Sequence, residues 1–242
     1  MLDRLGGRRV RFSDPAGQIL AGEWAEGLIR VQGRSFEPAA VDVLPPVNPG
    51  KVVGVTPNHA SQFDGDDPPE IDIFLKPRNA VVGHDRPVAL PLMDEVVNYE
   101  AELGVVVARH CSEVPVEGAM DVVAGFTCTN DLTMVSESTL NRMKVFDRAI
   151  PVGPVLVEPS AVPADATIEM VVNGHRTQQF TRQEYVHSVE EVLATVSSLV
   201  ALEPGDVITM GTATGIGPLS IGDETNIRIE GIGTLRNQFI DG

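Results

Sequence analysis

The sequence NYEAELGVVVAR, residues 98–109, sets two carboxylates at the front of an apolar strand. Its run LGVVV at 103–107 is rich in β-branched side chains, which favour extended structure. Side chains two positions apart on a strand point to the same face, so we expect Glu100 and Glu102 to lie side by side. Two like charges raise each other's pKa or require a cation between them. Taken alone, such a pair is more often a solvated strand edge than a functional site.

A third carboxylate changes that balance. Asp131 closes the expected strand GFTCTND, residues 125–131. Three carboxylates at strand ends, with water completing the shell, suit the hard oxygen coordination of magnesium or manganese. No His or Cys lies at ligand spacing beside them, so zinc is not expected. The sequence therefore predicts a Mg²⁺ or Mn²⁺ site formed by Glu100, Glu102 and Asp131.

The net charge of the chain limits which molecules are expected to bind to it. The 242 residues carry a net charge of −16, from 34 acidic and 18 basic side chains. This charge repels nucleic acid and anionic lipid, so neither nucleic acid nor membrane is an expected partner. It also repels a free anionic substrate, which therefore needs a local positive centre. With 43% hydrophobic residues, the chain is expected to bury a sizeable core.

The two cysteines, Cys111 and Cys128, form no CxxC motif and no disulfide framework. This usage favours a reducing compartment, and we expect buried thiols without a catalytic role. No segment reaches the ~18 apolar residues of a membrane span. The start MLDRLGGRRVRF lacks the apolar core of a signal peptide. We therefore predict a cytoplasmic protein.

Turn residues divide the chain. Short strands separated by glycines occupy the first 44 residues, and LPPVNPG at 44–50 is typical of a linker. We predict a small N-terminal β domain, 1–45, and a main domain, 46–242. The main domain contains one clear helix, SVEEVLATVSSLVAL at 188–202, with a capping box between Ser188 and Glu191. VNGHR at 172–176 predicts a type I′ hairpin. Strands dominate, so the predicted class is β-rich α+β.

Several blocks in order resemble the fumarylacetoacetate hydrolase family. They are YEAELGVVV, AMDVVAGFTCTND, KVFDRAIPVGPVLV, LEPGDVITMGTATGIGPLSIGD and IEGIGTLRN. The resemblance covers about residues 44–242. Within the family it is strongest to the bacterial branch of 2-hydroxyhepta-2,4-diene-1,7-dioate isomerase and 5-oxopent-3-ene-1,2,5-tricarboxylate decarboxylase.

The resemblance implies a mixed β-sheet roll with a small N-terminal β domain, usually assembled as a homodimer. It implies that Glu100, Glu102 and Asp131 bind magnesium, or manganese. The implied substrate is a small 2-oxo or 2-hydroxy-dienedioic acid whose keto-acid end chelates the metal. A metal used in this way stabilises an enolate as a Lewis acid.

The same resemblance implies roles for three further residues. Lys144 is expected to be catalytic, holding the substrate or the charge that develops on it. Lys76, in FLKP, is expected to bind substrate. Thr212, in MGTATG, matches a family turn that binds a carboxylate, although Ala213 replaces the usual proline.

Two positions depart from the family pattern. The loop at 56–70, expected to move or become ordered on binding, carries His59 as a catalytic candidate, but Gln62 replaces the glutamate that pairs with it. Gln62 is expected to contact substrate, but its amide is unable to act as a base. Asp64 could supply the missing carboxylate, but its spacing from His59 is wrong for one helical turn. Val135 stands where the family often has an arginine, and Arg142 or Arg148 is the candidate replacement.

Losing the glutamate weakens hydrolysis most, because hydrolysis needs a positioned base and a water. The sequence therefore favours a metal-dependent decarboxylase or isomerase, as in aromatic-compound catabolism. An acylpyruvate-type or fumarylacetoacetate-type C–C hydrolase is the alternative. A non-catalytic homologue that binds a ligand or a partner is an alternative of another class.

Overall fold

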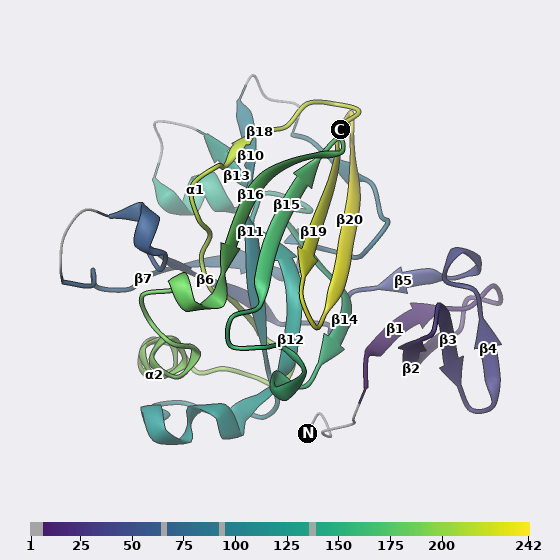
Figure 1. The fold of residues 1–242 in the computed structure, drawn as a ribbon, viewed down its shortest axis with the longest axis horizontal. Coiled ribbons are helices and arrows are strands. Elements are labelled where there is room, and N and C mark those ends of the chain that lie inside the picture. Colours follow the sequence, from purple (N-terminus) through teal and green to yellow (C-terminus); the bar gives the residue numbers. More distant parts are fainter. Residues whose placement is uncertain (1–6, 64–66, 92–94, 136–138) are drawn as a thin grey trace.

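The computed structural model describes residues 7–63, 67–91, 95–135 and 139–242, and it confirms a β-rich α+β roll (Figure 1). A large sheet contains β1 (Arg9–Ser13), β2 (Ile19–Ala25), β3 (Leu28–Val31), β4 (Arg34–Phe36), β5 (Asp42–Leu44), β6 (Lys51–Thr56), β7 (Asp72–Pro77), β8 (Val81–Val82), β11 (Ala101–Val107), β12 (Val123–Asn130), β14 (Ile150–Val157) and β17 (Val207–Thr209). A second sheet contains β9 (Val88–Ala89), β15 (Thr167–Val172), β16 (His175–Thr181), β19 (Glu224–Ile229) and β20 (Gly233–Ile240). A third contains β10 (Val96–Tyr99), β13 (Thr133–Val135) and β18 (Gly217–Pro218).

Helices are few and short. The α-helices are α1 (Leu140–Lys144) and α2 (Val189–Leu199). The 3-10 helices are η1 (Pro38–Ala40), η2 (Ala60–Gln62), η3 (Arg78–Ala80), η4 (Val116–Val122), η5 (Pro159–Ala161) and η6 (Arg182–Glu184). In the part of the chain that the structure describes, no helix combines the length and the apolar character needed to cross a bilayer.

The large sheet is mixed. Its order is β4-β3-β2-β1-β14-β12-β11-β17-β6-β7, with β5 beside β1 and β8 beside β14. Most pairs are antiparallel, whereas β17 runs parallel to β6. The five-stranded sheet, order β16-β15-β19-β20-β9, lies in front of β11 and β12 in Figure 1. Side chains of both sheets, among them Leu103, Phe126, Ile168, Ile227 and Leu235, share one buried cluster that forms the core.

The central pair β11–β12 positions the predicted carboxylates. Every residue of both strands is buried, as their nearly continuous apolar sequences require. A β-carbon on Gly104 would lie 2.7 Å from the side chain of Thr129, so glycine permits the close approach of the two strands. The register pairs Glu102 with Thr129, and the Asp131 N–H donates to the Glu100 carbonyl at 2.9 Å. All three carboxylates therefore lie at one end of this pair.

One strand expectation was wrong in detail. The segment from residue 98 onward was expected as one strand, but it forms the end of β10 and then β11, with Glu100 between them. The Glu100 N–H donates at 3.0 Å to the side-chain oxygen of Asn130 on β12, in place of a backbone carbonyl. The chain passes here from the three-stranded sheet to the large sheet, and this break turns Glu100 toward Asp131.

The predicted helix cap at Ser188 and the predicted hairpin turn at Asn173 are both present. Ser188 and Glu191 form the predicted capping box, and the helix then spans Val189–Leu199. Asn173 and Gly174 both have positive φ, 50° and 81°, as a type I′ hairpin requires. The predicted helix extended three residues too far, because Val200 is already extended at φ −146°.

Strands β1–β5 form a lobe that stands to the side of the main body in Figure 1. One pairing, Arg9 with Leu156, joins β1 to β14 of the body. The predicted boundary between domains 1–45 and 46–242 falls directly after β5. The division into two domains stays a prediction.

Candidate metal centre and its cavity

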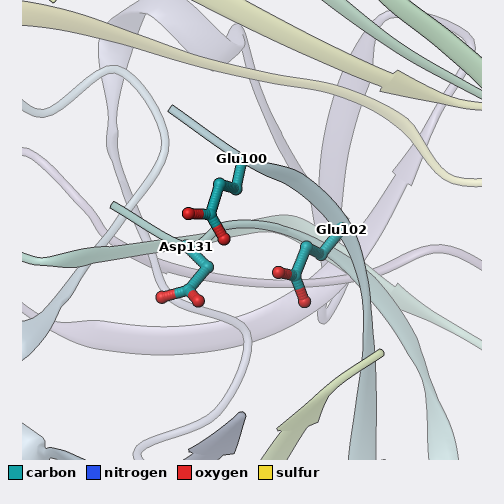
Figure 2. Close-up of side chains that lie close together, drawn as sticks. All are labelled: Glu100, Glu102 and Asp131. Carbon is teal, nitrogen blue, oxygen red and sulfur yellow. The ribbon is translucent and has the colours of Figure 1, made fainter. Parts of the chain in front are cut away.

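Three carboxylates converge at the end of the β11–β12 pair (Figure 2). Glu102 lies on β11, Glu100 lies just before it, and Asp131 follows β12. One oxygen from each side chain lies within 4.8 Å of the others. Glu102 and Asp131 are buried, and the side chain of Glu100 is 13% exposed. This arrangement brings together all three residues that the sequence predicted as metal ligands.

Glu102 has little compensation for its charge. Its Oε2 accepts a hydrogen bond of 2.6 Å from the N–H of Gly211, which lies two residues after β17. Burial, followed by the nearby charges of Asp131 and Glu100, raises the pKa of Glu102 well above its usual range. Gly211 has a φ of +88°, a conformation that glycine adopts without strain. A cation at this point would relieve the electrostatic cost of ionising Glu102.

Lys144, at the end of α1, reaches into the carboxylate cluster. Its Nζ donates to Asp131 Oδ2 at 2.5 Å, to Glu100 Oε2 at 3.0 Å and to Thr133 Oγ1 at 2.5 Å. The same hydroxyl of Thr133 donates to Glu100. Burial by itself would lower the pKa of Lys144, but the charges of Asp131 and Glu100 outweigh it and raise the pKa. Lys144 is therefore a charged ammonium on the cavity wall.

Lys76 lies behind the cluster, where it was expected to contact substrate. It is fully buried, and its Nζ donates to the carbonyls of Leu132 and Ala149 at 2.6 and 2.7 Å. A third contact is the ion pair with Asp131 Oδ1 at 2.5 Å. An ammonium has three hydrogens, and three partners surround this one. Lys76 does not line the cavity, so its position differs from the expected contact and fits a role in orienting Asp131.

The charges of this cluster fit a divalent metal ion. With all five groups ionised, three carboxylates and two ammonium groups leave one negative charge in excess. The donors are all carboxylate oxygens, which magnesium and manganese prefer. A divalent cation would make the centre net positive, as binding an anionic acid to a chain of charge −16 requires. The residues present therefore fit the predicted metal.

The carboxylates open onto a cavity of about 340 Å³. Its neutral polar lining consists of Thr56, Gln62, Asn98, Thr133 and Thr212. Its apolar lining consists of Val55, Phe74, Val135, Leu140, Met143 and Ile216. Of the residues predicted to bind substrate or act in catalysis, Gln62, Lys144 and Thr212 line this cavity, whereas Lys76 and His59 do not.

Gln178, on β16, is a residue near the site that the sequence analysis missed. Its side chain accepts from the Ala101 N–H at 3.1 Å and donates to Thr212 Oγ1 and to the Ala213 carbonyl, both at 2.9 Å. It therefore ties the strand of the metal ligands to the turn that carries Thr212. A signal was present, since Gln178 shares the buried face of its strand with Phe180.

His59 is buried beside the cavity and does not enter it. Its Nδ1 accepts from the Ser61 N–H at 3.1 Å, which assigns the hydrogen of the neutral ring to Nε2. The ring packs edge-on against Phe180 and Tyr185, at centroid distances of 5.0 and 6.4 Å. The nearest carboxylate oxygen to Nε2, Glu184 Oε1, lies at 4.0 Å. Burial lowers the pKa of His59, and Glu184 opposes this shift only in part.

The described part of the 56–70 loop, which we call the lid, therefore contains no His–Glu pair. Gln62 lines the cavity, and its Oε1 accepts from the Asn58 N–H at 3.4 Å. No carboxylate of the described residues hydrogen-bonds to His59. Asp64 lies outside the described residues. The catalytic role of His59 stays a prediction.

Neither candidate for the missing arginine reaches the cavity. Arg142 is on the exposed side of α1, and Arg148 donates to the Pro87 carbonyl at 3.1 Å. Val135 itself lines the cavity. The cysteines lie elsewhere in the core, and burial raises the pKa of Cys128.

A buried carboxylate triad at the end of a strand pair in a mixed β-roll offers three oxygen ligands to a metal ion. Residues 51–240 match the fumarylacetoacetate (FAA) hydrolase C-terminal family. The chain belongs to this family, as the sequence predicted.

Relatives extend the comparison. The chain is 38% identical over 220 residues to a protein of Archaeoglobus fulgidus, and the match covers 88% of each. It is 33% identical over 191 residues to the 4-hydroxyphenylacetate degradation bifunctional isomerase/decarboxylase of Salmonella dublin. That match covers 76% of this chain and 44% of the bifunctional enzyme. The chain therefore spans less than half of that enzyme.

Two solved structures share the whole fold. The 5-carboxymethyl-2-hydroxymuconate delta-isomerase of Mycobacterium smegmatis superposes with a TM-score of 0.90 at 32% identity, covering 97% of this chain and 99% of that one. Maleylpyruvate hydrolase from Sphingobium sp. SYK-6, solved with manganese(II) and pyruvate, gives 0.84 at 25% identity, with 97% and 99% covered. The relatives and structures that carry an enzyme name are thus a bifunctional isomerase/decarboxylase, an isomerase and a hydrolase.

Proposed function

We propose that this chain is a divalent-metal-dependent enzyme that forms an enolate from a 2-oxo or 2-hydroxy-dienoic acid, as a decarboxylase or isomerase of aromatic-compound catabolism. One observation carries the proposal: a buried carboxylate triad forms the wall of a cavity that also presents Lys144 and Thr212. The related isomerases and decarboxylases support the reaction class. We also infer, from the family resemblance, a homodimer in the cytoplasm.

Glu100, Glu102 and Asp131 would hold magnesium or manganese. A bound divalent metal would supply Lewis-acid stabilisation of negative charge on the oxygens of the keto acid. Lys144 adds a fixed positive charge on the same wall, which favours an anionic substrate and the enolate formed from it. The Thr212 hydroxyl accepts from Gln178, so its own hydrogen remains available for a substrate carboxylate oxygen.

The lid residues favour decarboxylation or isomerisation over hydrolysis. Hydrolysis needs a base that activates water within hydrogen-bond reach of the substrate. His59 lies outside the cavity lining, and the described residues of the 56–70 loop that line the cavity, Thr56 and Gln62, are neutral. A C–C hydrolase remains the alternative, supported by the likeness to maleylpyruvate hydrolase.

Metal binding tests the site. Calorimetry with Mn²⁺ and Mg²⁺, with and without oxalate as an enolate mimic, compares wild type with Glu102→Gln and with the exposed control Glu117→Gln. We expect one metal per chain, and oxalate binding only when metal is present. Glu102→Gln should lose more metal affinity than the roughly 10–100-fold typical of an outer-shell partner. Wild-type protein that binds neither metal at millimolar concentration would contradict the site.

Turnover tests the reaction. A panel of 2-oxo acids, unsaturated and β-carboxylated, is incubated with metal-loaded protein, and the products are identified. Carbon dioxide or a shifted double bond, without a new carboxylic acid fragment, supports the decarboxylase or isomerase. A new acid fragment identifies the hydrolase. Metal and oxalate binding without any turnover identifies a non-catalytic ligand-binding homologue.

A further inference from the structure

The cavity has two chemically different walls. One wall carries the carboxylate triad with Lys144 and Thr212. The apolar part of the lining, called the second wall below, consists of Leu140 and Met143 of α1 with Val55, Phe74, Val135 and Ile216. It adjoins Lys144, whose Nζ lies 4.6 Å from the centroid of the Phe74 ring. A 2-oxo acid bound at the triad would direct the remainder of its carbon chain toward this second wall.

Helix α1 explains why the second wall is apolar. Leu140, Met143 and Lys144 are spaced i, i+3 and i+4, so they share one face of the helix and line the cavity. Arg142 lies between them in sequence and is exposed to solvent. The helix thus presents two apolar side chains to the cavity and turns its arginine away.

The rim of the cavity is also apolar. Val135 and Ile216 line it, and each is 46% exposed, which is high for large aliphatic side chains in this chain. Both would lose contact with water if an apolar group occupied the cavity, which is favourable. Neutral hydrogen-bonding groups nearby, Asn98 and Gln62, suit a carbonyl oxygen and carry no charge.

Positive charge is scarce on the cavity lining. Among the described lining residues, Lys144 is the single lysine or arginine, and Asp131, Glu100 and Thr133 already surround its ammonium. A second carboxylate on the substrate would lose its water against this wall with no cation to pair with it.

We propose that the second wall selects an uncharged distal group, so that the chain isomerises 2-oxo or 2-hydroxy-dienoic monoacids with an alkyl or acyl end in preference to dicarboxylates. A monoacid has no carboxylate besides the one that chelates the metal, so this inference selects the isomerase over the decarboxylase. This inference rests on the proposed function and narrows its substrate class. It replaces the dienedioic acid that the family resemblance implies for this chain with a monoacid.

A matched pair of probes tests the selection. Calorimetry on the Mn²⁺-loaded protein compares 2-oxohexanoate with 2-oxohexanedioate, which share the keto-acid head and differ only in a terminal methyl or carboxylate. We expect the monoacid to bind at least ~10-fold more tightly, the lower end of what pocket complementarity provides. Equal binding, or tighter binding of the diacid, would overturn the inference and leave the proposed function standing. Binding of neither probe, nor of oxalate, would overturn both.

A substitution tests whether the lack of positive charge on the cavity lining causes this preference for a monoacid. Val135→Arg places a cation on the rim, and Val145→Arg is the control, since Val145 is similarly exposed at 47% and lies outside the cavity lining. We expect Val135→Arg to tighten the diacid by up to about 5-fold, the range of a partly exposed ion pair, with the monoacid little changed. If Val135→Arg gives the diacid no advantage over Val145→Arg, a lack of positive charge is not the cause of the selection.

Discussion

Asp131 and Glu102, two carboxylates of the candidate metal centre, have different electrostatic environments. Both oxygens of Asp131 are within 2.5 Å of an ammonium, Lys76 on one side and Lys144 on the other. Burial favours the neutral acid, but the two lysines outweigh it, so the pKa of Asp131 lies below its usual range. Glu102 has only a backbone N–H and its pKa is raised. The site therefore holds one carboxylate that is already ionised and one whose ionisation a metal would complete.

His59 provides a pH prediction at the same scale. Burial holds its pKa in the folded protein below the value of about 6.5 of an unfolded chain. The neutral ring therefore contributes its full stability above about pH 6.5, and this contribution falls as the pH drops below that value. We expect the difference in the free energy of unfolding between wild type and His59→Gln to shift against wild type as the pH falls from 7.5 to 5.

Urea denaturation at each pH measures this difference. His175→Gln is the control, because His175 is exposed in the β15–β16 hairpin. Its stability should follow the wild-type pH dependence. A constant gap between wild type and His59→Gln across the whole range would show that His59 takes up its proton equally in both states.

At the scale of elements, Gln178 connects three segments distant in sequence. It lies on β16 and bonds to Ala101 at the start of β11 and to the turn of Thr212. The separations along the chain are 77 and 34 residues. The pairing of β11 with β17 and the hydrogen bond from the Gly211 N–H to Glu102 also join β11 to the segment that leads into the Thr212 turn. Gln178 adds a buried side-chain link from β16 to both.

Gln178→Leu should loosen that connection. It leaves the Ala101 N–H without its partner, which costs about 1–3 kcal/mol of unfolding free energy. It also frees Thr212, so we expect KM for the 2-oxo acid to rise more than kcat falls, while Mn²⁺ affinity changes little. Gln179→Leu, on the exposed face of the same strand, is the control. If Mn²⁺ affinity falls by the same factor as KM rises, the substitution disrupts the site in general, and Gln178 does not specifically position Thr212.

At the scale of the molecule, the catalytic body and the N-terminal lobe share a sheet through one strand pair. The triad lies at one end of the β11–β12 pair, whereas the lobe joins the body at β14. Side chains add further contacts between the two parts, among them the ring contact of Trp24 with His84 and the ion pair of Asp42 with Arg86, and none of these residues belongs to the triad. This arrangement makes the predicted domain division testable in the full-length chain.

Gly22→Ala is the disturbance we choose. A β-carbon there would lie 2.4 Å from the Arg30 carbonyl oxygen on β3, so the backbone of the lobe has to shift. We expect faster hydrogen exchange in residues 19–36, with metal and oxalate affinity unchanged. Gly118→Ala is the control, since its β-carbon would make an ordinary contact of 3.7 Å with Pro115. Loss of protection that extends to β11 and β12 would contradict two separate domains.

Much of the site was predictable from the sequence, because its chemistry is local. Glu100, Glu102 and Asp131 were identified from strand ends and residue type, and those features depend on near neighbours. The same holds for the Ser188 cap and the Asn173 hairpin turn. Lys76 and Lys144, however, looked alike in sequence, as basic residues near the site.

The sequence by itself determined the residue types, the strand-rich class and the three carboxylates, since periodicity and turn chemistry act over a few residues. Tertiary structure alone decided that Lys76 lies behind Asp131, that Gln178 links two segments and that His59 lies outside the cavity lining. Each depends on packing between parts of the chain that are far apart; for example, 73 residues separate Lys76 from its partner Ala149. Such distances are set by the summed packing of whole sheets, which no short stretch of sequence specifies.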